Sequence, residues 1–175
     1  AIKGLEVAAR AKDPYLRANA IEALARIDPV AFGALFHQAL ADPDGGVRCA
    51  LLGAAVSLYP PEVEGLSRTA FDDKDWRPRM QGVDNLAGRK TKGSVTTLLV
   101  ALADPRPVVG LRANAVLQDL TGKRYSQRIE WEAWWKDNEA TFEFKDGADG
   151  KAGASGEDTR AAFNGIRIDS DHCFF

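Results

Sequence analysis

Acidic and basic residues recur in pairs along the first two thirds of the sequence, with an aspartate standing shortly before an arginine each time. A carboxylate and a guanidinium can form short, charge-assisted hydrogen bonds, and a carboxylate can also cap a helix. A catalytic site needs to occur only once, so the recurrence predicts a structural role: each aspartate caps a helix and each arginine ties adjacent turns. The members of this predicted ladder are Asp13, Arg17, Asp42, Arg48, Asp75, Arg79, Asp104 and Arg112.

A second group of candidate residues is aromatic. Trp131, Trp134 and Trp135 are spaced i, i+3 and i+4, and Phe142 continues the series, so their rings share one face of a helix. An aromatic stripe at this spacing is more often part of a core than a ligand site. We therefore interpret it as a capping aromatic face that closes the open end of the fold.

The remaining chemically active residues do not form a recognisable site. Gly122-Lys123 is followed by Arg124, where a phosphate-binding loop requires serine or threonine. The two histidines leave little material for a zinc site, and the two cysteines exclude a disulfide framework. The sequence thus predicts no catalytic, cofactor-binding or metal-binding residues and no cofactor.

Three basic residues, Arg89, Lys90 and Lys92, lie close enough together to contact an acidic partner or a phosphate backbone. No aromatic residues are interleaved with them, and the chain has no net positive charge to support such a role. We interpret them as a solvated turn between helices.

The elements that must position these residues form an internal repeat. The pentapeptide Ala-Leu-Ala-Asp-Pro occurs at 39–43 and again, identically, at 101–105. Phe71 halves this interval, since it lies midway between Leu40 and Leu102 in the sequence. Identity over five residues at twice a basic period is hard to obtain by chance, so the sequence contains a repeat of about 31 residues.

Each repeat indicates two helices. Phe32, Leu35, Phe36, Ala39 and Leu40 follow helical spacing, and the same pattern recurs in later units. Asp-Pro steps at 13–14, 28–29, 42–43 and 104–105 predict helix starts. A pair of short helices cannot bury its own apolar stripe, whereas stacked pairs share a continuous core. The predicted fold is all-α, an α-α superhelix of about four helix pairs over residues 1–142.

The repeat resembles the HEAT-repeat family, especially the short bacterial HEAT-like repeats first noted in phycobilisome lyases. The resemblance covers about residues 1–120 and rests on a turn aspartate, an apolar-arginine pair and a small residue after it. These appear as Asp13…Leu16-Arg17…Ala20, Asp42…Val47-Arg48…Ala50 and Asp104…Leu111-Arg112…Ala115. The third unit departs from the pattern because Pro78 precedes Arg79. The resemblance implies a HEAT-like solenoid.

The composition changes after this array. Residues 143–158 are rich in glycine, alanine and acidic residues, which predicts a linker. In 159–175, apolar residues separated by polar ones predict short strands and the truncated start of a second domain. The motif Phe163-Asn164-Gly165-Ile166, followed by Ser170 and a final apolar group, resembles the entry into a bacterial von Willebrand factor A domain. That resemblance implies a fragment of a larger bacterial multidomain protein.

The charge balance bears on function. The chain has 23 basic and 25 acidic residues, and residues 1–142 carry a net charge of +1, unlike most nucleic-acid-binding domains. No apolar run approaches the roughly 18 residues that span a bilayer. We predict a non-catalytic scaffold that binds another protein, with no nucleic-acid partner. The alternatives are a bilin-attaching enzyme, implied by the resemblance to phycobilisome lyases, and a DNA-binding protein like the HEAT-like glycosylases.

Overall fold

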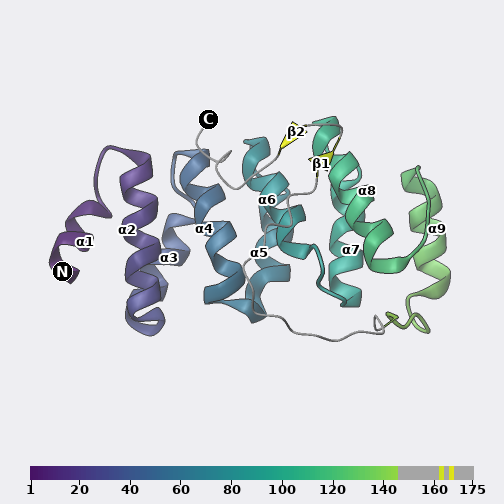
Figure 1. Ribbon diagram of the computed structural model, residues 1–175, viewed down its shortest axis with the longest axis horizontal. Coiled ribbons are helices and arrows are strands. Elements are labelled where there is room, and N and C mark those ends of the chain that lie inside the picture. Colours follow the sequence, from purple (N-terminus) through teal and green to yellow (C-terminus); the bar gives the residue numbers. More distant parts are fainter. Residues whose placement is uncertain (146–161, 164–165, 168–175) are drawn as a thin grey trace.

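The computed structural model describes residues 1–145, 162–163 and 166–167. Its helices are α1 (Ile2–Ala8), α2 (Pro14–Ile27), α3 (Pro29–Ala39), α4 (Gly45–Leu58), the 3-10 turn η1 (Pro60–Glu62), α5 (Val63–Ala70), α6 (Trp76–Leu86), α7 (Lys92–Ala101), α8 (Pro107–Thr121) and α9 (Arg128–Asn138). They follow one another along the long axis of the molecule in chain order (Figure 1). The all-α prediction is confirmed for the described residues, apart from one very short strand pair.

That strand pair consists of β1 (Ala162–Phe163) and β2 (Ile166–Arg167), which are antiparallel, with Phe163 opposite Ile166. Both strands fall within the segment where the sequence predicts strands. The predicted linker after residue 145 and the rest of 159–175 lie outside the described residues. The von Willebrand factor A expectation, which depends on those residues, stays a prediction.

The even-numbered helices form one row, in which α2 packs against α4, α4 against α6, and α6 against α8. Each of them also packs against an odd-numbered neighbour, as in the pairs α2–α3, α5–α6 and α7–α8. Helix α9 packs at the far end against α7. None of the helices in the described part of the chain is long and apolar enough to span a membrane.

Capping side chains decide where most of these helices begin. The carboxylates of Asp13, Asp28, Asp44 and Asp75 accept backbone N–H groups in the first turns of α2, α3, α4 and α6. The Thr91 hydroxyl does the same for α7. Two predicted starts are wrong by two residues, because α4 and α8 begin after residues 44 and 106 and not at the Asp-Pro steps 42–43 and 104–105.

The apolar core consists of two clusters. One is built from α2, α3 and α4 around Leu24, Phe36 and Leu51, and the other runs from α6 to α9. Polar groups join them where α4 meets α6, since the Asn85 side-chain amide donates to the Leu52 carbonyl oxygen at 2.8 Å. Asn85 is itself buried, so this bond satisfies an amide that would otherwise destabilise the interior.

His37 on α3 links its helix to the next pair. Its Nδ1 lies 2.7 Å from the Gly33 carbonyl oxygen and its Nε2 lies 2.8 Å from a Glu62 carboxylate oxygen. Both partners are acceptors, so both bonds form only when the ring carries two protons. The hydrogen bond to Gly33, helped by the one to Glu62, raises the pKa of His37 above 6.5 although burial opposes it.

We expect the His37 link to weaken as the pH rises. A raised pKa means that the stabilising contribution is complete below about pH 6.5 and is lost as the pH passes through the higher folded-state value. The unfolding free energies of the wild type and His37→Gln should therefore differ most at pH 5.5 and least at pH 8.5. An NMR titration should also show that Glu62→Gln lowers the pKa of His37. An unchanged pKa in Glu62→Gln would contradict this account.

Candidate functional site

Three arginines on successive even-numbered helices each bind a carboxylate that lies 25 residues further along the chain. In every pair the guanidinium Nε and Nη2 donate to the two carboxylate oxygens, which is the bidentate geometry of strong charge-assisted bonds. The pairs are Arg17–Asp42 (3.0 and 2.8 Å), Arg48–Asp73 (2.6 and 2.6 Å) and Arg79–Asp104 (2.7 and 3.0 Å). We call these three pairs the rungs.

Backbone groups complete each rung. The arginine Nη1 donates to the carbonyl oxygen six residues before it, and the carboxylate accepts the N–H of the residue two positions after it. The carbonyl oxygens belong to Ala11, Asp42 and Asp73, and the N–H groups to Asp44, Asp75 and Arg106. The third rung is the most enclosed, with side-chain exposures of 9% for Arg79 and 3% for Asp104.

The observed rungs differ from the predicted Asp/Arg ladder in the residues that form the pairs. Asp73, which the sequence reading left out, takes the place given to Asp75, because the acceptor of Arg48 comes from the next helix pair. Asp75 instead caps α6 and binds Arg77. A Cβ atom at Gly45 would collide with the Asp75 carboxyl group, so glycine there permits this close approach. Asp13 caps α2 and joins no rung.

Arg112 also lies outside the rungs. Gly110 stands one repeat period after Arg79 and occupies the position of the rung arginine in α8. A Cβ atom at Gly110 would lie only 3.2 Å from the Leu102 carbonyl oxygen, so the chain passes close there. Arg112 falls two residues later in the helix and binds Asp84 on α6 at 2.6 Å. The sequence Arg-Ala-Asn-Ala, which occurs at 17–20 and again at 112–115, is therefore not in structural register between α2 and α8.

The carboxyl groups of Asp42 and Asp73 have depressed pKa values. Burial alone would raise the pKa of Asp42 and Asp73, but the paired guanidinium and a backbone N–H outweigh it and hold both values below 3.8. The Asp73 hydrogen bond correspondingly raises the pKa of Arg48. A carboxylate with a depressed pKa stabilises the fold at higher pH, and this contribution is lost as the pH falls through the depressed value.

We expect this linkage to appear in the Arg48→Ala variant. Without the guanidinium, the pKa of Asp73 should no longer be depressed. The wild type should then exceed the variant in unfolding free energy by a constant amount above about pH 5, and by progressively less below pH 3.8. Urea unfolding at pH 7, 5, 4 and 3 measures the difference. A difference that does not shrink at pH 3 would contradict the assigned linkage.

The capping aromatic face lies where α9 closes the described helices. Trp131 is fully buried and Trp135 nearly so, whereas Trp134 is half-buried. The indole N–H of Trp131 donates to Asn114 at 2.7 Å and that of Trp135 to Thr96 at 2.9 Å. The rings of Trp131 and Trp134 also contact each other edge-on. These contacts place the face in the core.

The basic cluster at residues 89–92 also has internal partners. Arg89 donates to the Pro60 carbonyl oxygen at 3.1 Å, Lys90 to that of Lys145 at 2.8 Å, and Lys92 to that of Ala140 at 2.9 Å. The two lysines hold the segment that follows α9. The cluster therefore links the turn before α7 to other elements of the fold. The prediction of a solvated turn did not include these hydrogen bonds.

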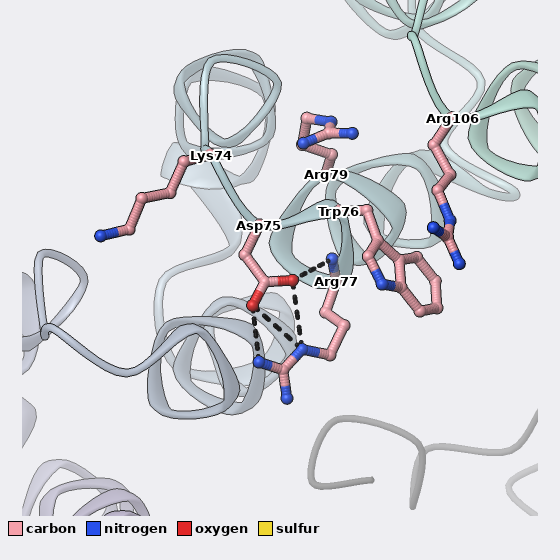
Figure 2. A pocket seen from close by; sticks show the side chains of 6 residues that line it. All are labelled: Lys74, Asp75, Trp76, Arg77, Arg79 and Arg106. Atoms are coloured by element: carbon pink, nitrogen blue, oxygen red, sulfur yellow. Dashed lines mark hydrogen bonds and ion pairs between the residues drawn. The ribbon is translucent and has the colours of Figure 1, made fainter.

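A basic hollow of about 720 Å³ lies at the N-terminal ends of α6 and α8. It is lined by Lys74, Asp75, Trp76, Arg77, Arg79 and Arg106 (Figure 2). Arg77 and Arg79 are neutralised by Asp75 and Asp104. Lys74 and Arg106 are exposed and form no ion pair with any carboxylate in the described part of the chain. They leave the hollow with excess positive charge.

Arg106 stands at the N-cap of α8, where the other helices of the even-numbered row have an aspartate. Asp13, Asp44 and Asp75 recur at the repeat period and cap α2, α4 and α6, and the next position in the series is Arg106. Helix α8 accordingly has no side-chain cap. Loss of such a cap typically costs about 0.5–2 kcal/mol, and a cation at a helix N-terminus is itself unfavourable.

The Arg106 guanidinium instead lies over the Trp76 ring, with its central carbon 5.0 Å from the ring centroid. Trp76 belongs to the neighbouring helix α6 and packs partly against the core, so its ring is held in place beneath the cation. Sequence reasoning missed this site because it took the Asp104-Pro105 step as the cap of α8. Continuing the periodic series from Asp75 would have revealed the arginine.

Comparison of the chain with protein-family models, with curated proteins and with solved structures finds no match. Among the described residues, no group of three or more histidine, cysteine, aspartate or glutamate side chains could hold a metal ion. The hollow combines an aromatic ring with two cations that no described carboxylate neutralises, an arrangement that can bind a carboxylate or another anion.

Proposed function

We propose that residues 1–142 form a HEAT-like α-α superhelix of about four helix pairs that serves as a non-catalytic scaffold for binding another protein. The observation that carries this proposal is the set of three rungs. The same atoms meet at the same spacing in consecutive units, as expected when each unit contacts only its neighbours. The capping aromatic face closes one end, which supports a stacked array whose last unit needs protection.

Residues at equivalent positions of the even-numbered helices differ, although the rungs between these helices repeat. Tyr15, Gly46, Arg77 and Val108 recur at the repeat period and occupy equivalent positions in the first turns of the even-numbered helices. Tyr15 is 60% exposed and Val108 37% exposed, whereas Gly46 is buried and Arg77, the only charged residue of the four, is half-buried. The exposed positions carry different side chains on a repeating backbone and can contact different parts of an extended partner, which supports a binding role.

The test is capture from a native lysate by the immobilised chain, with an unrelated helical protein of similar charge as the control. We expect one protein to be recovered specifically, and its recovery should be unchanged when the lysate is first treated with nuclease. The eluate is analysed by mass spectrometry, by visible absorbance for bilins and by staining for nucleic acid. Recovery of bilin or nucleic acid in place of protein would overturn the scaffold proposal in favour of one of the alternative classes.

A further inference from the structure

We propose that the basic hollow between the N-terminal ends of α6 and α8 binds an acidic, extended segment of the partner protein. In this proposal Arg106 and Lys74 pair with carboxylates of that segment, and Trp76 orients the Arg106 guanidinium. The inference rests on the scaffold function proposed above and assigns to it both a surface and the chemistry of the partner.

Arg106 is locally unfavourable for the stability of α8, because it stands at the N-cap without capping the helix. The three preceding helices of the row are capped by aspartate, and aspartate before a proline already works at Asp13-Pro14. Arg106-Pro107 has the same backbone setting, because the Arg106 N–H donates to Asp104 at 2.8 Å just as the N–H groups of Asp44 and Asp75 donate to their rungs. Arg106 leaves α8 without a capping side chain and forms no ion pair among the described residues. A residue that lowers local stability without such a compensation is typical of a functional position.

Arg106 and Lys74 place their charges at opposite sides of the hollow. The Trp76 ring faces the Arg106 guanidinium, whereas the Lys74 side chain points away from both of them (Figure 2). Stacking restricts the guanidinium and leaves its in-plane N–H groups available for a bidentate carboxylate. The exposed lysine can reach a second carboxylate of the same segment, so an extended peptide with spaced acidic residues fits the charges.

The charges around the hollow favour a protein partner over a nucleic acid. A phosphate backbone needs a continuous positive track. Acidic residues instead lie close to the hollow, since the charge of Asp44 acts on Arg77 and Asp72 stands two residues before Lys74. The Asp72 side chain is 82% exposed and lies 3.9 Å from Arg68. A strand of phosphates that left the hollow in this direction would meet negative charge, whereas a peptide can alternate its charges.

The experiment begins with selection of random dodecapeptides displayed on phage against the full chain. We expect the selected peptides to be enriched in aspartate and glutamate. Individual peptides are then synthesised with a fluorophore, and their dissociation constants are measured by anisotropy for the wild type and the variants. A ten-nucleotide thymidine oligomer serves as the nucleic-acid probe.

The key variant is Arg106→Asp, which restores the cap found in the other three helices. It should weaken binding of the acidic peptides about tenfold or more through charge reversal, while raising the melting temperature by about 3 °C through the new cap. Loss of binding then cannot be attributed to unfolding. Arg106→Gln should give an intermediate loss of affinity.

Lys74→Glu has a matched control in Lys12→Glu. Lys12 lies two repeat periods before Lys74 at the equivalent position of its own unit, but has proline in the place of Trp76. Lys74→Glu should weaken binding by about threefold and Lys12→Glu by less than about twofold, as expected for exposed charges. The wild-type affinity should also fall as the salt concentration rises.

Several results would overturn the inference. Selected peptides that lack acidic enrichment, or that bind Arg106→Asp as tightly as the wild type, would leave the scaffold function standing but move its binding surface elsewhere. A thymidine oligomer that binds through Arg106, with no peptide selected, would overturn both proposals. A dimer that dissociates in Arg106→Asp would assign the hollow to a second copy of the chain and exclude the acidic partner.

Discussion

Replacing Arg79 with alanine is expected to reduce the unfolding free energy by about 3–5 kcal/mol, because it leaves the Asp104 carboxylate buried without its guanidinium. Asp104 is 3% exposed in its side chain, the lowest value of any rung carboxylate. The variant also loses the bond from Arg79 to the Asp73 carbonyl oxygen, which is 2.8 Å long. Both losses fall between α6 and its neighbours, so the effect should extend along the array.

Urea unfolding followed by circular dichroism measures this effect. The matched control is Arg26→Ala, since Arg26 forms an ion pair with Glu22 on the surface and is 52% exposed. That variant should change the stability by less than about 1 kcal/mol. Adding Asp104→Asn to Arg79→Ala should recover part of the loss, because an amide is less costly to bury than a charge. Equal effects of Arg79→Ala and Arg26→Ala would show that the rung is not stabilising.

The second large effect is expected at the end of the fold. Replacing Trp131 with alanine should destabilise the protein by about 3–5 kcal/mol, the usual range for removing a fully buried large aromatic side chain. The substitution opens a void among α8, α9 and Tyr125, and it leaves the Asn114 side-chain oxygen without the indole N–H. The contacts of α9 with α7 should weaken as well when the Trp131 side chain is removed.

Thermal unfolding of Trp131→Ala is compared with that of two further variants. Trp131→Phe keeps most of the ring volume but loses the bond to Asn114, so it should cost less than the alanine variant. Ile129→Ala changes a residue on the same helix that is 71% exposed and should have little effect. If Trp131→Ala were no more destabilising than Ile129→Ala, the aromatic face would not close the fold.

The local features of this protein could be predicted from its sequence. The spacing of Phe32, Leu35 and Phe36 places them on the inward side of one helix, and Phe36 is fully buried in α3. The spacing of Trp131 and Trp135 likewise places both rings on one buried face of α9. Such predictions succeed because helical periodicity acts within one element and needs no knowledge of its neighbours.

The partners of the charged residues depended on the tertiary structure. Arg48 has Asp44 four residues before it, yet its guanidinium binds Asp73 of the next helix pair. Spacing along one helix cannot reveal an acceptor that comes from another helix. It also cannot reveal a slip in register, such as the one that puts Gly110 in the rung position and Arg112 against Asp84. Only the packing of α8 on α6 decides between those two positions.

The basic hollow shows the same division. The sequence by itself determined an internal repeat and two helices in each unit. Its period also puts Arg106 in the place of a capping aspartate, although the prediction of a cap at Asp104 missed this position. Only the tertiary structure decided that Arg106 stacks on Trp76 of the adjacent helix and that Lys74 lines the same hollow without a counter-charge among the described residues. The physical reason is that composition reports net charge, whereas binding depends on which charges remain unpaired after the helices pack.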